Sequence, residues 1–191
     1  MNVRGLTPPQ TVGPFFHGGM LTDPLNTLVT PDTHGERIRI EGHVYDGDRA
    51  PVSDAVVEIW QANAAGRYRH PADRREVALD PSFIGFGRAG TDEAGFFWFE
   101  TIRPGPVPFM RQGTQAPHLN VAVFARGLLH HLATRLYFRD EPANAADPVL
   151  GLVPEPRRTT LLASPMDSDA AAVYRFDIVL QGDAETVFFK Y

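Results

Sequence analysis

Short apolar stretches that alternate with a period of two, separated by turn residues, most limit the folds open to this chain. RIRIEGHVY (37–45) places Ile38, Ile40 and Val44 on one side, and QAPHLNVAVF (115–124) alternates in the same way. Seventeen glycines and seventeen prolines are spread along the 191 residues and do not gather in one linker. This pattern predicts many short strands joined by turns, and therefore an all-β sandwich.

Further strand-like runs follow at intervals along the chain. They cover 55–68, 87–102, 118–127, 134–140, 173–182 and 186–191. We expect hairpin turns at 46–47 (Asp-Gly) and 92–95 (DEAG), and a short helical segment in EPRRTTLLAS (155–164). Residues 1–36 lack periodicity and are predicted to form an extended arm that packs on the domain and on a partner chain. Residues 37–191 then form the β-sandwich core of a single domain.

Charge and composition narrow the possible functions. The net charge is -5 and the pI is about 5.8, which gives no electrostatic basis for binding nucleic acid or an anionic membrane. No apolar run approaches the ~18 residues that a membrane span needs, and MNVRGLTPPQ lacks the apolar core of a secretory signal. The chain has no cysteine, which excludes disulfides and thiolate metal sites. We expect a cytoplasmic protein.

The strand predicted from residue 118 onwards raises the question of a metal site. Residues two apart on a strand project to the same side, so two histidines at this spacing would form a metal clamp. The chain has His118 but Asn120. His130 and His131 are adjacent, so on a strand they would point to opposite faces. The pattern alone leaves open whether His118 is a ligand or a structural histidine.

Several motifs together carry a resemblance to a known family. They are TPPQTVGPFFH (7–17), GHVYDGDRAPVSDAVVEIWQANAAGRYRH (42–70), LDPSFIGFGRAGTDEAGFFWFETIRPGPVPF (79–109), HLNVAVFARG (118–127), TRLYF (134–138) and YRFDIVLQGDAETVFF (174–189). In this order, and over nearly the whole chain, they resemble the intradiol ring-cleaving dioxygenases. The resemblance implies an intradiol-dioxygenase-type β-sandwich with an extended N-terminal arm and short helical segments, acting in the catabolism of aromatic compounds.

The family binds non-haem Fe(III) through two tyrosinates and two histidines. Hard phenolate oxygens and imidazoles suit this cation. At the matching positions this chain has Arg75, Val107, His118 and Asn120. Tyr68 belongs to the GRYRH motif, in which the family's tyrosine is not a ligand. The resemblance therefore implies no metal ligands and no catalytic residues in this chain, and Fe(III) on a partner chain.

Some members of the family are built from related α and β chains, and the loss of three ligands is the signature of the α chain. The resemblance implies a β-chain partner, a higher hetero-oligomer of α–β units, and an active site at the α–β interface for an aromatic substrate and O₂. It assigns substrate binding to Thr11, Gly13, Pro14 and Arg126, the last as a partner for a substrate carboxylate.

The residues also allow other interpretations. The arm could simply pack through its paired aromatics at 15–16, and Arg126 could form an interface or surface ion pair. Arg135 is expected to be structural, and Trp60 and Gln61 to belong to the core and scaffold. For the whole chain, two alternatives stay open: a self-sufficient dioxygenase with relocated iron ligands, and a non-enzymatic β-sandwich interaction module.

Overall fold

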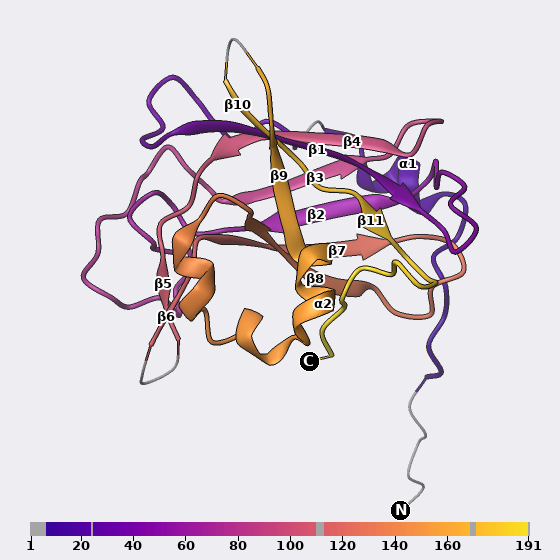
Figure 1. Ribbon diagram of the computed structural model, residues 1–191. Coiled ribbons are helices and arrows are strands. Elements are labelled where there is room, and N and C mark those ends of the chain that lie inside the picture. Colours follow the sequence, from indigo (N-terminus) through magenta and orange to yellow (C-terminus); the bar gives the residue numbers. More distant parts are fainter. Residues whose placement is uncertain (1–6, 24, 110–112, 169–170, 191) are drawn as a thin grey trace, which may run out of the picture.

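The computed structural model describes residues 7–23, 25–109, 113–168 and 171–190, and most of this chain is strand and loop (Figure 1). The strands are β1 (Arg37–Tyr45), β2 (Val56–Trp60), β3 (Phe86–Gly90), β4 (Phe96–Ile102), β5 (Val107–Pro108), β6 (Thr114–Gln115), β7 (His118–Phe124), β8 (Leu132–Phe138), β9 (Leu162–Met166), β10 (Ala172–Arg175) and β11 (Ile178–Val179). The helical segments are α1 (Phe16–Met20), η1 (Pro142–Ala146), η2 (Leu150–Leu152), α2 (Glu155–Arg158) and η3 (Thr159–Leu161).

The main strands form two layers that strand β9 joins at one edge. In one layer β3, β2, β7 and β8 are antiparallel neighbours, with Trp60 opposite Asn120 and His118 opposite Tyr137. In the other layer β1 pairs with β4, β10 and β11. The start of β9 pairs with β8 and its end with β10, so the sandwich is nearly closed on this side (Figure 1). The predicted all-β sandwich is confirmed.

The core lies between the layers and follows the alternation seen in the sequence. Every second residue of β1 is buried, including Ile38, Ile40 and Val44. The neighbouring strand β4 contributes Phe97 and Phe99, and the facing strands β2 and β7 contribute Val57, Ile59, Leu119, Val121 and Val123. Burial of such apolar side chains is the main favourable term in folding. It fixes the strand register, because a slip of one residue would turn each apolar set outward.

Gly42 allows a break in the partner of β1. A Cβ atom at this position would lie 1.9 Å from the carbonyl oxygen of Phe176. Here β10 has ended and β11 has not begun, and the backbone N–H of Phe176 donates to the carbonyl of Glu41. The single strand predicted at 173–182 is therefore two short strands with an irregular step between them.

Both predicted turns form, but only the first folds the chain back on itself, and only briefly: the N–H of Asp46 donates to Ala50 and that of Val52 to Val44. After Asp46-Gly47, an isolated bridge joins Tyr45 to Pro51, and the chain then crosses to the other layer as β2. The segment 92–95 makes a tight turn, with the N–H of Gly95 donating to Asp92. However, β3 before this turn pairs with β2, and β4 after it pairs with β1. Both turns therefore carry the chain from one layer to the other.

Two predictions near the carboxyl terminus also differ from the structure. The helix predicted at 155–164 ends early: α2 and η3 reach Leu161, and the next residues belong to β9. In the predicted strand at 186–191, only Phe189 bridges to Ala133, while Tyr191 lies outside the described residues. Pro156 allows one helical turn to begin. The apolar Leu161 and Ala163 are buried in the sandwich, where pairing of Ala163 with β8 favours a strand over a longer helix.

The N-terminal segment lies along the open edges of both layers. The N–H of Arg88 in β3 donates to the carbonyl of Leu25. Glu100 in β4 accepts from the N–H of Leu28 and donates to the carbonyl of Asn26. The segment therefore covers β3 and β4 at once. Residues 1–6 of the predicted arm and residue 24 lie outside the described residues. Within the described ranges, the structure contains no helix that is long and apolar enough to cross a membrane.

Candidate functional site

His118 and Asn120 lie at the start of strand β7, two residues apart on the same side of the strand. His118 is only 3% exposed, and its Nδ1 lies 2.7 Å from the carbonyl oxygen of Ala116. Burial, assisted by the nearby positive charge of Arg135, lowers the pKa of the imidazole to about 4. His118 is therefore neutral at pH 7, and Nδ1 carries the proton that the carbonyl accepts.

Asn120 already uses its amide group within the protein. Its Nδ2 donates to the carbonyl oxygen of Trp60 and to the hydroxyl oxygen of Tyr68, both at 3.1 Å. Burial raises the pKa of the Tyr68 phenol above its ordinary value. Asn120 thus ties the loop that carries Tyr68 to the sheet, and Tyr68 remains a protonated phenol.

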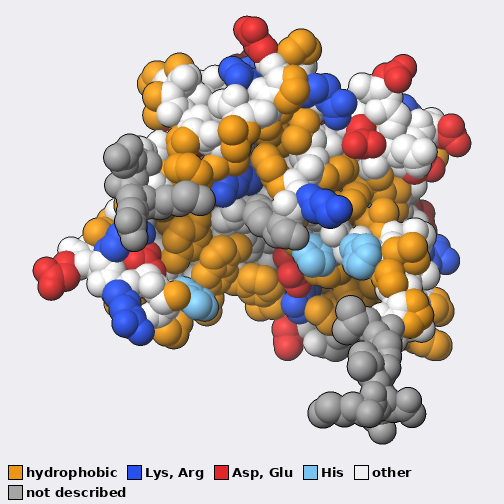
Figure 2. Space-filling model, turned by 90° about the horizontal axis from the view of Figure 1, so that it is seen from below, with side chains coloured by type: hydrophobic (Ala, Val, Ile, Leu, Met, Phe, Trp, Pro, Cys, Tyr) orange, Lys and Arg blue, Asp and Glu red, His pale blue; other side chains and the backbone are white. Residues whose placement is uncertain are grey.

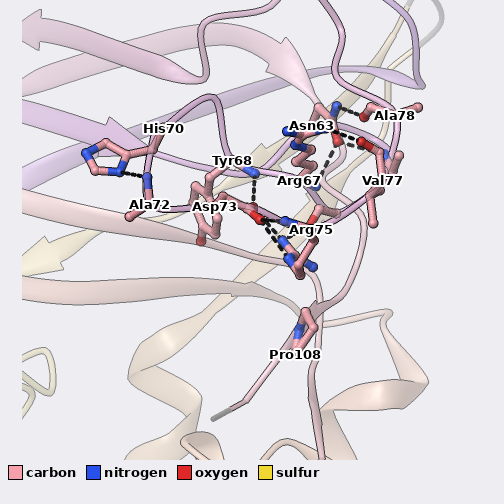
Figure 3. A network of polar contacts seen from close by, with 12 residues as sticks. Asn63, Arg67, Tyr68, His70, Ala72, Asp73, Arg75, Val77, Ala78 and Pro108 are labelled. Atoms are coloured by element: carbon pink, nitrogen blue, oxygen red, sulfur yellow. Dashed lines mark hydrogen bonds and ion pairs between the residues drawn. The ribbon is translucent and has the colours of Figure 1, made fainter. Parts of the chain in front are cut away.

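Arg75 does not project freely into the space of a missing ligand. Its Nε lies 2.8 Å from Oδ1 of Asp73, and its Nη2 lies 2.6 Å from Oδ2 (Figure 3). The same Nη2 donates to the carbonyl of Gly66 at 2.7 Å. Hydrogen bonds from Arg75 lower the pKa of Asp73 to about 2, and the backbone N–H of Tyr68 adds a further bond to this carboxylate. The Asp73–Arg75 ion pair therefore holds together the loop 66–75 through bonds within that loop.

Val107 lies in β5, opposite Gln115 in β6, and is buried. The loop 63–67 meets the adjoining PGP motif backbone to backbone, because a Cβ atom on Gly66 would lie 2.1 Å from the carbonyl oxygen of Pro106. Gly66 also has φ +77, which favours glycine. This close approach sets Val107 beside the Asp73–Arg75 pair, and together they line one cavity.

These residues do not fit a ferric ion. Arg75 is a cation paired with Asp73, Val107 offers no donor atom, and the amide nitrogen of Asn120 is engaged. At the four matching positions, only one imidazole nitrogen of His118 and the neutral amide oxygen of Asn120 remain as possible ligands, and neither is the anionic oxygen that Fe(III) prefers. Elsewhere in the described parts of the chain, no three His, Asp or Glu side chains gather in a way that could hold a metal.

The four residues predicted to bind substrate lie at the other end of β7. The hydroxyl oxygen of Thr11 accepts a hydrogen bond of 2.7 Å from the N–H of Gly127, the residue after Arg126. The ring of Phe16 packs on Phe124, with 5.6 Å between centroids. Segments 116 residues apart in sequence are thus joined here. Seven strand residues span roughly 20 Å, which separates this end from His118.

Arg126 makes an exposed ion pair in the chain. Its Nε binds the carboxylate of Asp54, and its side chain is 63% exposed. Within the described residues, neither Nη group has a hydrogen-bond partner, so this edge of the guanidinium remains available to a carboxylate. The alternative expected from the sequence, a surface ion pair, is therefore present, and it leaves most of the donors of Arg126 unused.

Gly13 and Pro14 lie at the exposed turn of the arm. The N–H of Phe16 donates to the carbonyl of Gly13 and closes the turn before α1. A Cβ atom on Gly13 would meet nothing within 4 Å, so no other part of the described chain comes close to it. Phe15 beside them is 89% exposed. The predicted packing through paired aromatics is correct for Phe16 and wrong for Phe15.

Three residues behave as the scaffold expected from the sequence. Gln61 is 1% exposed, donates to the carbonyl of Ile102 at 2.9 Å and accepts from the hydroxyl of Thr101 at 2.7 Å. Nη1 of Arg135 donates to Gln115 at 2.7 Å. Trp60 is half-buried and stacks on Tyr68. Apart from their spacing of two residues, nothing in the amino-acid sequence indicates that Asp73 would bind Arg75.

Comparison with known proteins agrees with this arrangement. A family model described as Dioxygenase matches residues 12–182. The chain is 45% identical to the protocatechuate 3,4-dioxygenase alpha chain of Burkholderia cepacia, over 96% of both chains. It is 37% identical to the beta chain from the same organism, over 91% of this chain and 74% of that one.

A solved structure shows the same fold. The dioxygenase domain of a dioxygenase carbohydrate-binding protein fusion from Streptomyces sp. SirexAA-E is 29% identical, with a TM-score of 0.64. The match covers 92% of this chain and 98% of that domain. Sequence and fold agree, and the chain belongs to the intradiol ring-cleaving dioxygenase family.

Proposed function

We propose that this chain is the alpha subunit of a protocatechuate 3,4-dioxygenase and works only together with a beta chain. The assembled enzyme adds both atoms of O₂ across the bond between the two hydroxylated ring carbons and yields 3-carboxy-cis,cis-muconate. The observation that carries this proposal is the intact family fold in which three of four ligand positions hold Arg75, Val107 and Asn120. Two of these side chains are committed to bonds of their own.

The family uses non-haem iron, and we assign this iron to the beta partner. Held there, the iron would supply the activation of the catechol towards O₂, and this chain contributes binding and exclusion of water. The greater identity to an alpha chain than to a beta chain supports this division of roles. The partner meets a surface that carries several exposed apolar residues, among them Phe15 and Leu129, and Figure 2 shows hydrophobic side chains over much of one face.

In the shared site, the arm and the end of β7 act on the substrate. The two free Nη groups of Arg126 orient the carboxylate of the substrate, an interaction to which guanidinium geometry is suited. Thr11 accepts from Gly127 and keeps its own hydroxyl proton for a substrate oxygen or a water molecule. Gly13 and Pro14 form a wall that excludes solvent, with open space beside Gly13 for a close approach.

The direct test is iron per chain, measured by elemental analysis. The chain is expressed in iron-replete medium alone and together with a beta chain of the family. We expect no bound iron in the isolated chain and about one iron per alpha–beta pair. The pair should elute together from a size-exclusion column. Stoichiometric iron in the isolated chain would instead show that the ligands have moved within it. A cytoplasmic location and a higher oligomer of alpha–beta units belong to the same proposal.

A further inference from the structure

The cavity beside Arg75 is separate from the arm site, at the other end of β7. It has a volume of about 480 Å³, and its lining includes Trp60, Tyr68, Arg74, Arg75 and Val107. Cavities in this range hold small organic ligands. The loop around Asp73 and the β5–β6 pair form its walls (Figure 3). Protein side chains alone therefore shape this cavity.

The cavity is rich in hydrogen-bond donors and has little accepting capacity left. Its carboxylate, Asp73, already accepts from Arg75 and from the backbone N–H of Tyr68, and its pKa of about 2 keeps it ionised. In contrast, Nη1 of Arg75 and the exposed guanidinium of Arg74 have no acceptor within the described residues. The donors that remain are cationic and suit an anion.

The local charge is opposite in sign to that of the whole chain. The charged residues of the lining are two arginines, Arg74 and Arg75, and one carboxylate, Asp73, within a chain of net charge -5. Positive charge concentrated at a cavity raises the local concentration of anions and favours their entry. The same cavity excludes cations, which agrees with the failure of these residues to fit a metal ion.

Tyr68 contributes a further donor and an aromatic wall. Its hydroxyl oxygen accepts from Asn120 at 3.1 Å, and its proton has no acceptor among the described residues. Its ring stacks with that of Trp60, with 5.8 Å between centroids and 16° between planes. Val107 and Pro108 also line the cavity with apolar groups. Flat apolar walls beside cationic donors favour a planar ring that bears a negative group.

We propose that this cavity binds a small aromatic carboxylate, with its ring beside Trp60 and Tyr68 and its carboxylate at Arg74 and Arg75. The site goes beyond the proposed function, because it needs neither the beta chain nor iron. Carboxylates reach such a site from two sources: aromatic acids, and the aliphatic acids formed when a ring is opened. The aromatic walls select the first class.

The test is isothermal titration calorimetry on the full chain without a partner, with 4-hydroxybenzoate as the probe. This probe lacks the paired hydroxyls of a catechol. We expect one binding site per chain. Phenol, which lacks the carboxylate, and adipate, which lacks the ring, should each bind at least ~10-fold more weakly. Equal affinity for phenol would overturn the role of the arginines, and equal affinity for adipate would overturn the choice of aromatic acids.

Variants locate the site. Arg74→Gln and Tyr68→Phe should each weaken binding about 5-fold, in line with the loss of one hydrogen bond. Arg74 makes no bond within the described chain, so its replacement leaves the fold intact and keeps the test valid. Arg175→Gln, which replaces an exposed arginine outside both sites, is the matched control and should bind normally. Arg126→Gln tests whether the probe binds at the arm instead.

No detectable binding in the millimolar range, or unchanged affinity in both cavity variants, would overturn the proposal. Loss of binding in Arg126→Gln alone would place the ligand at the arm and would overturn it equally. These outcomes are independent of the iron measurement, so failure here and failure of the proposed function can be told apart.

Discussion

The two ends of strand β7 each hold an arginine–aspartate pair, and the pairs differ in how far the protein encloses them. Near His118, Asp73 is 9% exposed and binds Arg75 through two guanidinium nitrogens. At the far end, Arg126 is 63% exposed and binds Asp54 through Nε alone. One pair satisfies its own loop, and the other leaves donors unused. The pair near His118 is a structural element of its loop, whereas Arg126 at the arm end keeps guanidinium donors that no described residue uses.

The largest effect should come from pH at the enclosed end. His118 has a pKa of about 4 in the folded chain and about 6.5 when unfolded. As pH falls from 6.5 to 4, His118 binds a proton in the unfolded state but stays largely unprotonated in the folded state. The free energy of unfolding therefore decreases, by about 3 kcal/mol at pH 4. Urea unfolding of the wild type and of His118→Gln at pH 4 and pH 7 measures this. Parallel losses in both proteins would assign the effect to other groups.

Removal of the enclosed carboxylate should be nearly as costly. Asp73→Ala removes the acceptor of Arg75 and of the N–H of Tyr68, and should lower the free energy of unfolding by about 2 kcal/mol. The matched control is Asp54→Ala at the exposed pair, for which we expect a loss of about 0.5 kcal/mol or less. Thermal or denaturant unfolding compares the two. Equal losses would mean that the two ends of β7 do not differ as described.

The exposed end should matter for catalysis more than for stability. In the assembled enzyme, Arg126→Ala should raise the KM for carboxylated catechols about 10-fold and leave that for catechol nearly unchanged. Arg175→Ala, which removes another exposed arginine paired with an aspartate, serves as the control. Steady-state oxygen uptake with both substrates gives the ratio. An equal rise for both substrates would remove the carboxylate role of Arg126.

The smallest effect concerns the contact of the arm with β7. Thr11→Val removes the acceptor of the Gly127 N–H and should weaken the attachment of the arm by about 1 kcal/mol. Thr11→Ser keeps the acceptor and should behave as the wild type. Limited proteolysis of the isolated chain measures the attachment, and cleavage within residues 7–20 should be faster in the valine variant. Identical cleavage rates in all three proteins would show that this hydrogen bond does not hold the arm.

The sequence predicts the strands better than their pairing, and for a physical reason. Alternation in 37–45 reports which residues face the core, and the structure buries them. It does not report which strand lies alongside, so a turn such as 92–95 reads as a hairpin even though it links two layers. Strand β9 is not predicted from the sequence, because it is short and contains Pro165. Its extended conformation is stabilised by pairing with β8 and β10.

The site shows the same division. The placement of His118 and Asn120 two residues apart on a strand could be predicted from the sequence, and both lie in β7. Their partners could not: Asn120 bonds to Tyr68 across 52 residues, and Arg126 to Asp54 across 72. Such long-range side-chain bonds leave no periodic trace. The sequence therefore indicates which positions to inspect, and the structure adds the contacts that these residues make.

The segment 25–28, which bonds to β3 and to β4, has a consequence for how the chain behaves during synthesis and storage. Unpaired strand edges serve as templates on which other chains add strands. This segment occupies an edge in each layer with one short stretch of backbone. A polypeptide that begins at residue 37 would lose this cover and present both edges to its neighbours. We expect such a truncated chain to form β-rich aggregates, so the segment before residue 37 protects the molecule against polymerisation.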